Sequence, residues 1–236
     1  MALFSRDGAE FLLRWLHFLS GITWIGLLYY FNFVQGPFFA EADAATKSVA
    51  TQKLVPRALW WFRWSASLTF LTGALIIANR AAAKPPDVPA MNPWAAAIFT
   101  GALFGTVMLA NVWGVIWRNQ KIVIASAVAA AKGGQANPAA AAAGRRAFLA
   151  SRTNVVFSIP MLFFMGAATH WPPTRITHPG AYWVALLVLV ALLEINALKA
   201  TTGITTKPIE KVPSVITTGF VVWAVVYALV KFVLSA

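Results

Sequence analysis

Histidines are the side chains in this sequence that could bind a redox metal, and two of the three lie in apolar surroundings. His17 lies about two turns into the first apolar segment, and His170 ends the fourth. Because ionisable groups are costly inside a bilayer, each is a candidate functional residue. Two neutral imidazoles at one depth on different helices are able to ligate one b-type haem iron axially. His178, in a short polar loop, is a weaker candidate ligand.

Residues around the two histidines fit a haem site. Gly21 follows His17 by one turn on the same face and would leave room for a flat macrocycle, and Trp24 is positioned to line the pocket. Arg14 and Arg175 are candidate partners of the haem propionates. The alternative is structural: each histidine bonds a carbonyl or lies at the interface, and Trp24 only packs. No catalytic residue can be assigned.

A second set of polar residues is expected toward the other face of the membrane. It comprises Asn111 near the end of the third segment, Arg152 and Asn154 at the start of the fourth, and Glu194 in the fifth, all at comparable depth. A buried carboxylate needs a cation or several donors, so Arg152 is the expected partner of Glu194. A structural polar cluster is the first interpretation, and a proton-conducting role is the alternative.

Helices that cross a membrane must position these residues. Hydrophobic residues make up 59% of the 236 positions and charged residues only 11%, against roughly 25% charged in soluble domains. Six segments are long and apolar enough to cross a bilayer, which requires an all-α polytopic bundle. They are Phe11–Val34, Leu59–Asn79, Trp94–Trp117, Asn154–His170, Tyr182–Leu198 and Val215–Leu234. We therefore expect a single integral membrane domain, 1–236. Its first helix is expected to end at Gln35–Pro37.

The connections between these segments predict the orientation. The longest, 118–152, is Ala-rich around a Gly-Gly and an Asn-Pro pair, so its flanking helices should run on and meet at a polar turn. Thirteen of the 19 Lys and Arg fall on the side of this connection. The positive-inside rule places that side in the cytoplasm and both termini in the periplasm of a bacterial inner membrane.

Composition argues against several other classes. There is no cysteine, which excludes disulfides, iron–sulfur clusters and covalently attached c-type haem. The net charge of +12 does not indicate nucleic-acid binding, because the basic residues lie between apolar segments and form no stripe on a polar scaffold. The expected surroundings are therefore the lipid bilayer and other proteins.

Two stretches resemble a known family. The segment from Asn111 to Lys121 (NVWGVIWRNQK) and that from Ser151 to His170 (SRTNVVFSIPMLFFMGAATH) are similar to the membrane domain of bacterial cytochrome-c-coupled urate oxidases. The opening Arg14–Gly26 (RWLHFLSGITWIG) fits the same family. The resemblance implies an oxidoreductase, urate oxidase-like, with His17 and His170 as haem ligands. The C-terminal cytochrome c domain of that family is missing, so we expect a separate c-type cytochrome as acceptor.

Three function classes follow. The first is a membrane-embedded b-haem redox protein that passes electrons to a periplasmic c-type cytochrome. The second is a non-catalytic accessory or scaffold subunit of a larger membrane electron-transfer complex. A small transporter is the weakest, because the sequence shows neither inverted halves nor interrupted helices.

Overall fold

The structure is a computed structural model that describes residues 4–83, 92–173, 175–199 and 202–235. Within these residues all regular structure is helical. The elements are α1 (Arg6–Tyr29), η1 (Tyr30–Gln35), α2 (Gly36–Glu41), α3 (Ala44–Ala83), α4 (Pro93–Asn111), η3 (Val112–Ile116), α5 (Trp117–Ala131), α6 (Ala140–His170), α7 (Pro179–Lys199), α8 (Lys207–Glu210), α9 (Val212–Leu229) and η4 (Val230–Leu234).

Six helical units are long and apolar enough to cross a membrane, which confirms the predicted multi-pass bundle. They are Arg6–Glu41, Ala44–Ala82, Pro93–Ala131, Ala140–His170, Pro179–Lys199 and Val212–Leu234. Large apolar side chains on their outer faces, among them Phe18, Ile22, Leu192 and Phe232, are exposed. Such faces suit lipid, because a bilayer accepts apolar surface that water does not.

The first unit continues beyond the expected end at Gln35–Pro37. The π-helical segment η1 leads directly into α2, which carries Pro37 in its first turn. Pro37 cannot donate a helical hydrogen bond, and it directly follows the π-helical turn, where the hydrogen-bond pattern of the helix changes. The helix therefore ends at Glu41, and Asp43 starts the next unit by accepting a hydrogen bond of 2.9 Å from the amide of Thr46.

Helix α6 is the centre of the bundle. Its membrane-spanning segment is the most buried of the six, and it packs against α4, α5, α7 and α9. The approach to α4 is close at Gly101, where a Cβ atom would lie 3.2 Å from the backbone nitrogen of Met165. Small residues permit such contact between membrane helices, which associate mainly through packing.

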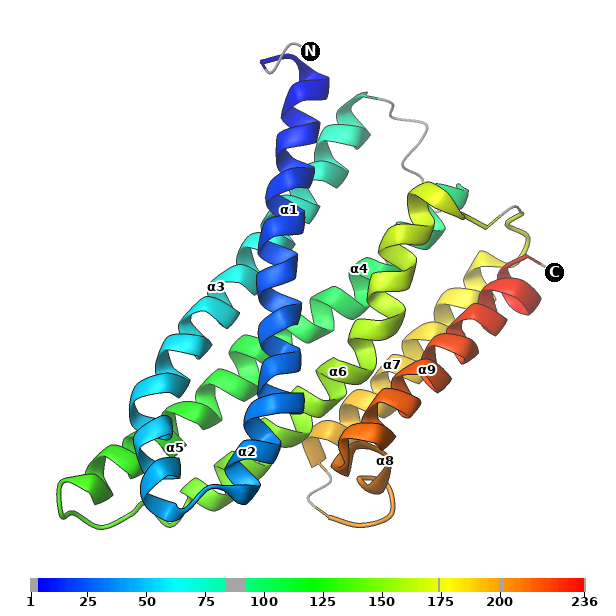
Figure 1. The fold of residues 1–236 in the computed structure, drawn as a ribbon. Coiled ribbons are helices and arrows are strands. Elements are labelled where there is room, and N and C mark those ends of the chain that lie inside the picture. Colours follow the sequence, from blue (N-terminus) through cyan, green and yellow to red (C-terminus); the bar gives the residue numbers. More distant parts are fainter. Residues whose placement is uncertain (1–3, 84–91, 174, 200–201, 236) are drawn as a thin grey trace.

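Helix α1 packs chiefly along α3, and Tyr29 at its C-terminal end is hydrogen-bonded to Ser158 of α6. Figure 1 shows α1 and α6 diverging toward the end of the bundle where both chain termini lie, which we call the terminal end. The opposite end holds the α2–α3 and α5–α6 connections and is called the turn end (Figure 1). Both termini thus lie on one side, and their periplasmic location stays a prediction.

The expected long connection is a helical hairpin. Helices α5 and α6 extend beyond the apolar segments and meet across residues 132–139, where Gly133 adopts a φ of 82°. Ser126 accepts a hydrogen bond of 2.9 Å from the amide of Asn137 and holds the turn against α5. The cytoplasmic location of this hairpin also stays a prediction.

Candidate functional site

The His17 side chain is held by α3. Its Nδ1 lies 2.9 Å from the carbonyl oxygen of Thr69 and 3.2 Å from the hydroxyl of Thr72. A carbonyl only accepts, so Nδ1 carries the proton and donates it. Both bonds engage Nδ1, and none in the described part of the chain engages Nε2. A neutral imidazole anchored through Nδ1–H, with the Nε2 lone pair left over, is the usual arrangement of a metal-ligating histidine.

Close packing fixes the ring position. A Cβ atom on Gly73 would lie 3.1 Å from Cε1 of His17, so a larger residue at 73 would push the ring away. A Cβ atom on Gly21 would make an ordinary contact of 3.8 Å with the Thr69 side chain. Gly21 therefore faces α3, beside the anchor of His17, and its role in this structure is helix packing.

Trp24 is part of the core and has an unused polar group. The side chain is 2% exposed, and its Nε1 has no hydrogen-bond partner among the described residues. Buried indole N–H groups usually find an acceptor. Trp24 thus lies on the interior face of α1, two turns beyond His17, with a donor still available.

His170 is exposed at the C-terminal end of α6. Helices α1 and α6 run in opposite directions and are joined by a hydrogen bond between Tyr29 and Ser158. His17 and His170 each lie twelve residues from that bond toward the terminal end, a rise of about 18 Å along either helix. Their depth along the bundle is therefore similar, as the sequence predicts. The two helices diverge toward this end (Figure 1), and the His17 ring is hydrogen-bonded to α3.

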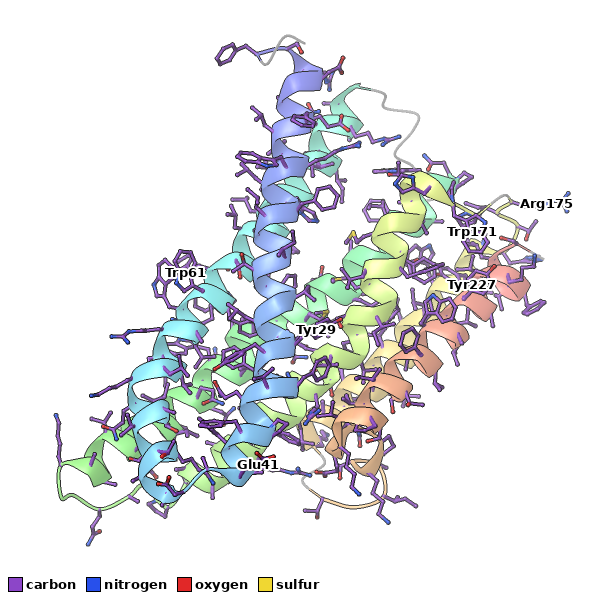
Figure 2. The ribbon with its side chains drawn as sticks, in the orientation of Figure 1. Tyr29, Glu41, Trp61, Trp171, Arg175 and Tyr227 are labelled. Carbon is purple, nitrogen blue, oxygen red and sulfur yellow. The ribbon has the colours of Figure 1, made fainter. Side chains whose placement is uncertain are left out.

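The two arginines expected to bind propionates are placed differently from each other. Arg14 forms an ion pair with Glu10, one turn away on α1. Arg175 lies near the end of η4, where its carbonyl accepts a hydrogen bond of 2.8 Å from Ser235. Figure 2 shows the Arg175 side chain at the edge of the bundle, on the side of α6 away from α1. The structure therefore does not gather both around His17.

Three of the four residues of the expected polar cluster are bonded together. Asn111 on α4 donates through Nδ2 to Oδ1 of Asn154 and to Oε2 of Glu194, both at 3.0 Å. Asn154 on α6 donates in turn to the carbonyl of Met108 at 3.0 Å. The network joins α4, α6 and α7, with Asn111 and Asn154 buried and Glu194 half-buried. It satisfies one carboxylate oxygen of Glu194 with an amide donor.

Arg152 does not belong to this network, and the expected Arg152–Glu194 ion pair is not formed. Residues two apart on a helix point in nearly opposite directions, so Arg152 cannot face the neighbours of Asn154. Its guanidinium carbon lies 5.0 Å from the ring centroid of Phe148. The side chain is 4% exposed, and its Nε and Nη1 have no hydrogen-bond partner in the described structure.

Several residues around the site were not predicted. Thr69, Thr72 and Gly73 hold His17. Tyr29 of α1 and Asn32 of η1 are hydrogen-bonded to Ser158 and Ser151 of α6 at 2.9 and 2.8 Å. The sequence signal that could have identified the polar ones is a polar residue within an apolar segment, which has a functional or structural role by default.

No cluster of three or more His, Cys, Asp or Glu able to hold a metal ion occurs in the described ranges.

These observations define the class: a polytopic membrane bundle with a polar network between α4, α6 and α7 and a histidine, His17, that is hydrogen-bonded to α3 through Nδ1. The model of the urate oxidase N-terminal family matches residues 88–230, more than half of the chain. The chain belongs to this family, which confirms the resemblance found in the sequence. The matched range contains His170 and the polar network, and it does not contain His17. No curated protein and no solved structure matches the chain.

Proposed function

We propose that this chain is a membrane-embedded b-haem redox protein of the urate oxidase type. It would take electrons from urate or another reductant and pass them to a separate periplasmic c-type cytochrome. The observation that carries the proposal is the anchoring of His17, whose Nδ1–H donates to the Thr69 carbonyl and leaves Nε2 for a metal.

His170 is the proposed second ligand. It has the depth of His17, and the family match includes it. It is exposed, at the C-terminal end of a helix whose middle, residues 152–158, is buried. A haem held by both residues would supply a one-electron redox couple near the terminal end. A site close to a membrane surface suits exchange with a soluble protein, because the partner cannot enter the bilayer.

The other residues of this region keep the proposed ligands in place. Thr69 and Thr72 fix the tautomer and orientation of His17. Trp24 is buried two turns beyond His17 on α1 and offers an N–H donor. Arg14 is a candidate propionate partner only through exchange with Glu10. Arg175 is left out of the proposed site, because it lies at the far edge of α6 (Figure 2).

Single-histidine variants test the assignment. His17→Ala and His170→Ala, purified in detergent, should each lose haem or change it from six- to five-coordinate, which shifts the Soret band. His178→Ala is the matched control, because it removes an imidazole from the same end of the bundle outside the site. If the Soret band is unchanged in both single variants, the haem is bound by other residues.

The second candidate function is an accessory subunit of a larger membrane electron-transfer complex. It is favoured by an apolar groove of about 340 Å³ between α1, α6 and α9, lined by Tyr29, Ile159, Leu162, Phe163, Phe220 and Trp223. A helix of another subunit would fit such a surface. Purification without haem but with a stable membrane partner would favour this function.

A further inference from the structure

Arg152 is a buried cation whose anionic partner is not found in the described structure. Its side chain is 4% exposed, and Nε and Nη1 make no hydrogen bond to any described residue. The guanidinium of an arginine stays protonated in proteins. A buried charge without a partner is costly, so an anion bound beside Arg152 would stabilise the fold directly. The surroundings of Arg152 indicate which anion fits.

Arg152 shares one face of α6 with Phe148 and Arg145, which precede it by four and seven residues. Both guanidinium groups lie near the same aromatic ring. Their central carbons are 5.0 Å (Arg152) and 5.4 Å (Arg145) from the ring centroid of Phe148. A cation–π contact of this kind attracts a guanidinium but does not neutralise it. This face of α6 therefore carries two positive charges around one ring.

Helix α8 supplies one negative charge to this face. Arg145 donates hydrogen bonds to both carboxylate oxygens of Glu210. The hydrogen bonding of Arg145 lowers the pKa of the Glu210 carboxyl group, and the positive charge of Arg152 lowers it further. Arg152 is thus close enough to affect Glu210, but its Nε and Nη1 do not bond to it. Among the described residues of this face, one carboxylate stands against two guanidinium groups.

The positive excess extends along both elements. Residues 140–152 of α6 and residues 202–211 around α8, which we call the α6–α8 junction, contain one acidic residue, Glu210, and five basic ones. The basic residues are Arg145, Arg146, Arg152, Lys207 and Lys211, and all but Arg145 and Arg152 are exposed. Basic pockets between membrane helices are typical binding sites for anionic lipid headgroups.

The depth of Arg152 matches the edge of the hydrocarbon layer. At the terminal end, the exposed Trp171 lies 5.9 Å from Tyr227, ring centroid to ring centroid, and aromatic pairs of this kind mark a membrane interface. Arg152 lies nineteen residues from Trp171, about 28 Å of helical rise. The hydrocarbon layer is about 30 Å thick. Arg152 therefore lies at the opposite boundary, and Arg145 lies about 10 Å further out, where lipid phosphates are found.

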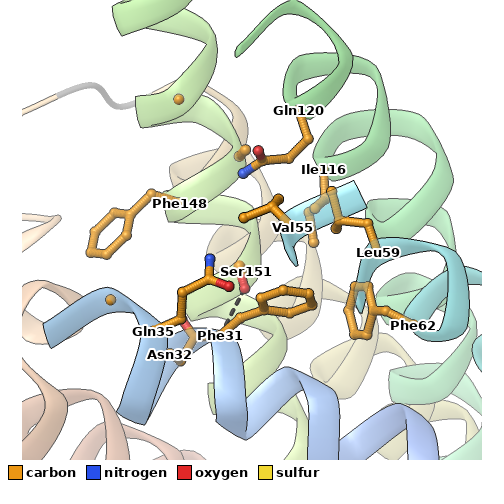
Figure 3. Close-up of a pocket in the computed structure, with 13 residues that line it drawn as sticks. Phe31, Asn32, Gln35, Val55, Leu59, Phe62, Ile116, Gln120, Phe148 and Ser151 are labelled. Atoms are coloured by element: carbon orange, nitrogen blue, oxygen red, sulfur yellow. Dashed lines mark hydrogen bonds between the residues drawn. The ribbon is translucent and has the colours of Figure 1, made fainter. Parts of the chain in front are cut away.

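An internal cavity beside Phe148 does not supply the missing partner. Phe148 lines a cavity of about 150 Å³ together with Gln35, Gln120 and Ser151 (Figure 3). Among the described residues that line this cavity, none is charged, and Arg152 is not one of them. Water in the cavity would therefore not solvate the guanidinium. We expect the partner on the α8 side of α6, where the other charged residues of the junction lie.

We propose that Arg152 binds the phosphate group of an anionic phospholipid at the α6–α8 junction. Nε and Nη1 donate hydrogen bonds to the phosphate oxygens, because charge-assisted bonds from arginine to phosphate are strong. The acyl chains lie against α7, where Ile195 and Leu198 are exposed. Helix α7 adjoins the junction, since Asn196 donates a 3.1 Å hydrogen bond to the carbonyl of Thr205. The lipid thus completes the charge balance of the fold.

Thermal unfolding of the full chain, purified free of lipid in a neutral detergent, tests the proposal. Phosphatidylglycerol should raise the midpoint of unfolding at a concentration at least about tenfold lower than phosphatidylcholine. Both lipids carry a phosphate, but the choline cation competes with arginine for it. Inorganic phosphate at the same concentration should leave the midpoint unchanged. Equal responses to the two lipids, or equal stabilisation by inorganic phosphate, would overturn the lipid assignment.

Arg152→Met replaces the cation by an apolar side chain. Without lipid, this variant should unfold at a higher temperature than the unaltered chain, because the unpaired buried charge is gone. Phosphatidylglycerol should then lose its advantage over phosphatidylcholine. Arg118→Met is the matched control: Arg118 is exposed on α5, so its loss should leave the lipid preference intact. A lower midpoint of lipid-free Arg152→Met, or an undiminished preference for phosphatidylglycerol, would overturn the role of Arg152.

A second variant covers the case in which Arg152→Met is not recovered from membranes. Arg152→Lys keeps the charge and loses the guanidinium donors, so its preference for phosphatidylglycerol should be weaker than that of the unaltered chain. An unchanged preference would overturn the proposed hydrogen bonds. These measurements do not report on haem, so their failure leaves the proposed function untouched.

Discussion

The hydroxyl groups of Tyr29 on α1 and Ser158 on α6 lie 2.9 Å apart. Tyr29 lies between the two helices in Figure 2, near the level where they begin to diverge toward the terminal end. Since the helices run antiparallel, equal distances along the chain from this bond lead to equal depths. His17 and His170 occupy two such equivalent positions.

A second bond joins the same two helical units nearer the turn end. Asn32, in η1, donates a 2.8 Å hydrogen bond to Ser151 of α6. Counted from this bond, His17 lies fifteen residues and His170 nineteen residues toward the terminal end. The two bonds together therefore place the histidines within about 6 Å of the same depth, on helices that diverge.

Orientation in the membrane is the first prediction. A reporter active only in the cytoplasm should be silent when it is fused after the last residue of the chain, because the basic side chains concentrate at the turn end. The control is the same reporter inserted between Gly133 and Gly134, where it should be active. Activity at the C-terminal fusion would reverse the topology and place the histidines on the cytoplasmic side.

The polar network gives a pair of contrasting variants. Asn154→Leu removes the acceptor of Asn111 and the donor to the Met108 carbonyl, so stability in detergent should fall by about 1–3 kcal/mol. Glu194→Gln keeps an oxygen for Asn111 and should change stability by less than about 0.5 kcal/mol. A loss of several kcal/mol in Glu194→Gln would show that the carboxylate charge is paired after all.

Close packing of α4 on α6 gives the next prediction. Gly101→Val introduces carbon atoms where even a Cβ lies 3.2 Å from Met165 and 3.3 Å from the carbonyl oxygen of Met161. Overpacking of this kind should cost about 1–3 kcal/mol and lower the midpoint of thermal unfolding. Gly166→Val is the control, since a Cβ on Gly166 meets nothing within 4 Å. Equal effects of the two changes would argue against this helix contact.

Acid should weaken the attachment of α8. Arg145 donates hydrogen bonds to Glu210 and thereby lowers the pKa of that carboxyl group. A depressed folded-state pKa means that the ion pair stabilises the fold near neutral pH. This stabilisation is lost as the pH falls, first below the ordinary pKa of glutamate and then through the lowered pKa of Glu210. The effect should be small, because Glu210 is partly exposed and surface ion pairs contribute little.

Thermal unfolding between about pH 7 and pH 3 checks this prediction. The midpoint of the unaltered chain should decrease more steeply than that of Glu210→Gln, which cannot form the ion pair at any pH. Parallel curves for the two proteins would show that Glu210 does not contribute.

The sequence was sufficient for those features that depend on position along the chain. The apolar segments predict the spans, and the register of His17 and His170 follows from their places within two of them. Features that depend on the direction of a side chain were not predictable in the same way. Arg152 and Asn154 share a depth but face different neighbours, because a helix turns by about 100° per residue.

Tertiary contacts decided the remaining differences. The π-helical turn of η1, which continues the first helix past Pro37, shows no signal in its residue types. The anchoring of His17 depends on the carbonyl of Thr69, a backbone group that every residue has. Arg175 follows a loop whose course depends on its contact with η4. Each outcome depends on which helices become neighbours, and composition does not specify that.

Ligation of haem b by His17 and His170 is tested most directly by the absorption spectrum of the full chain, purified in detergent from haem-replete cells, before and after reduction. We expect a Soret band and, on reduction, the sharpened visible bands of a low-spin haem with two imidazole ligands. A folded protein whose spectrum has no haem absorption would show that the chain does not hold haem.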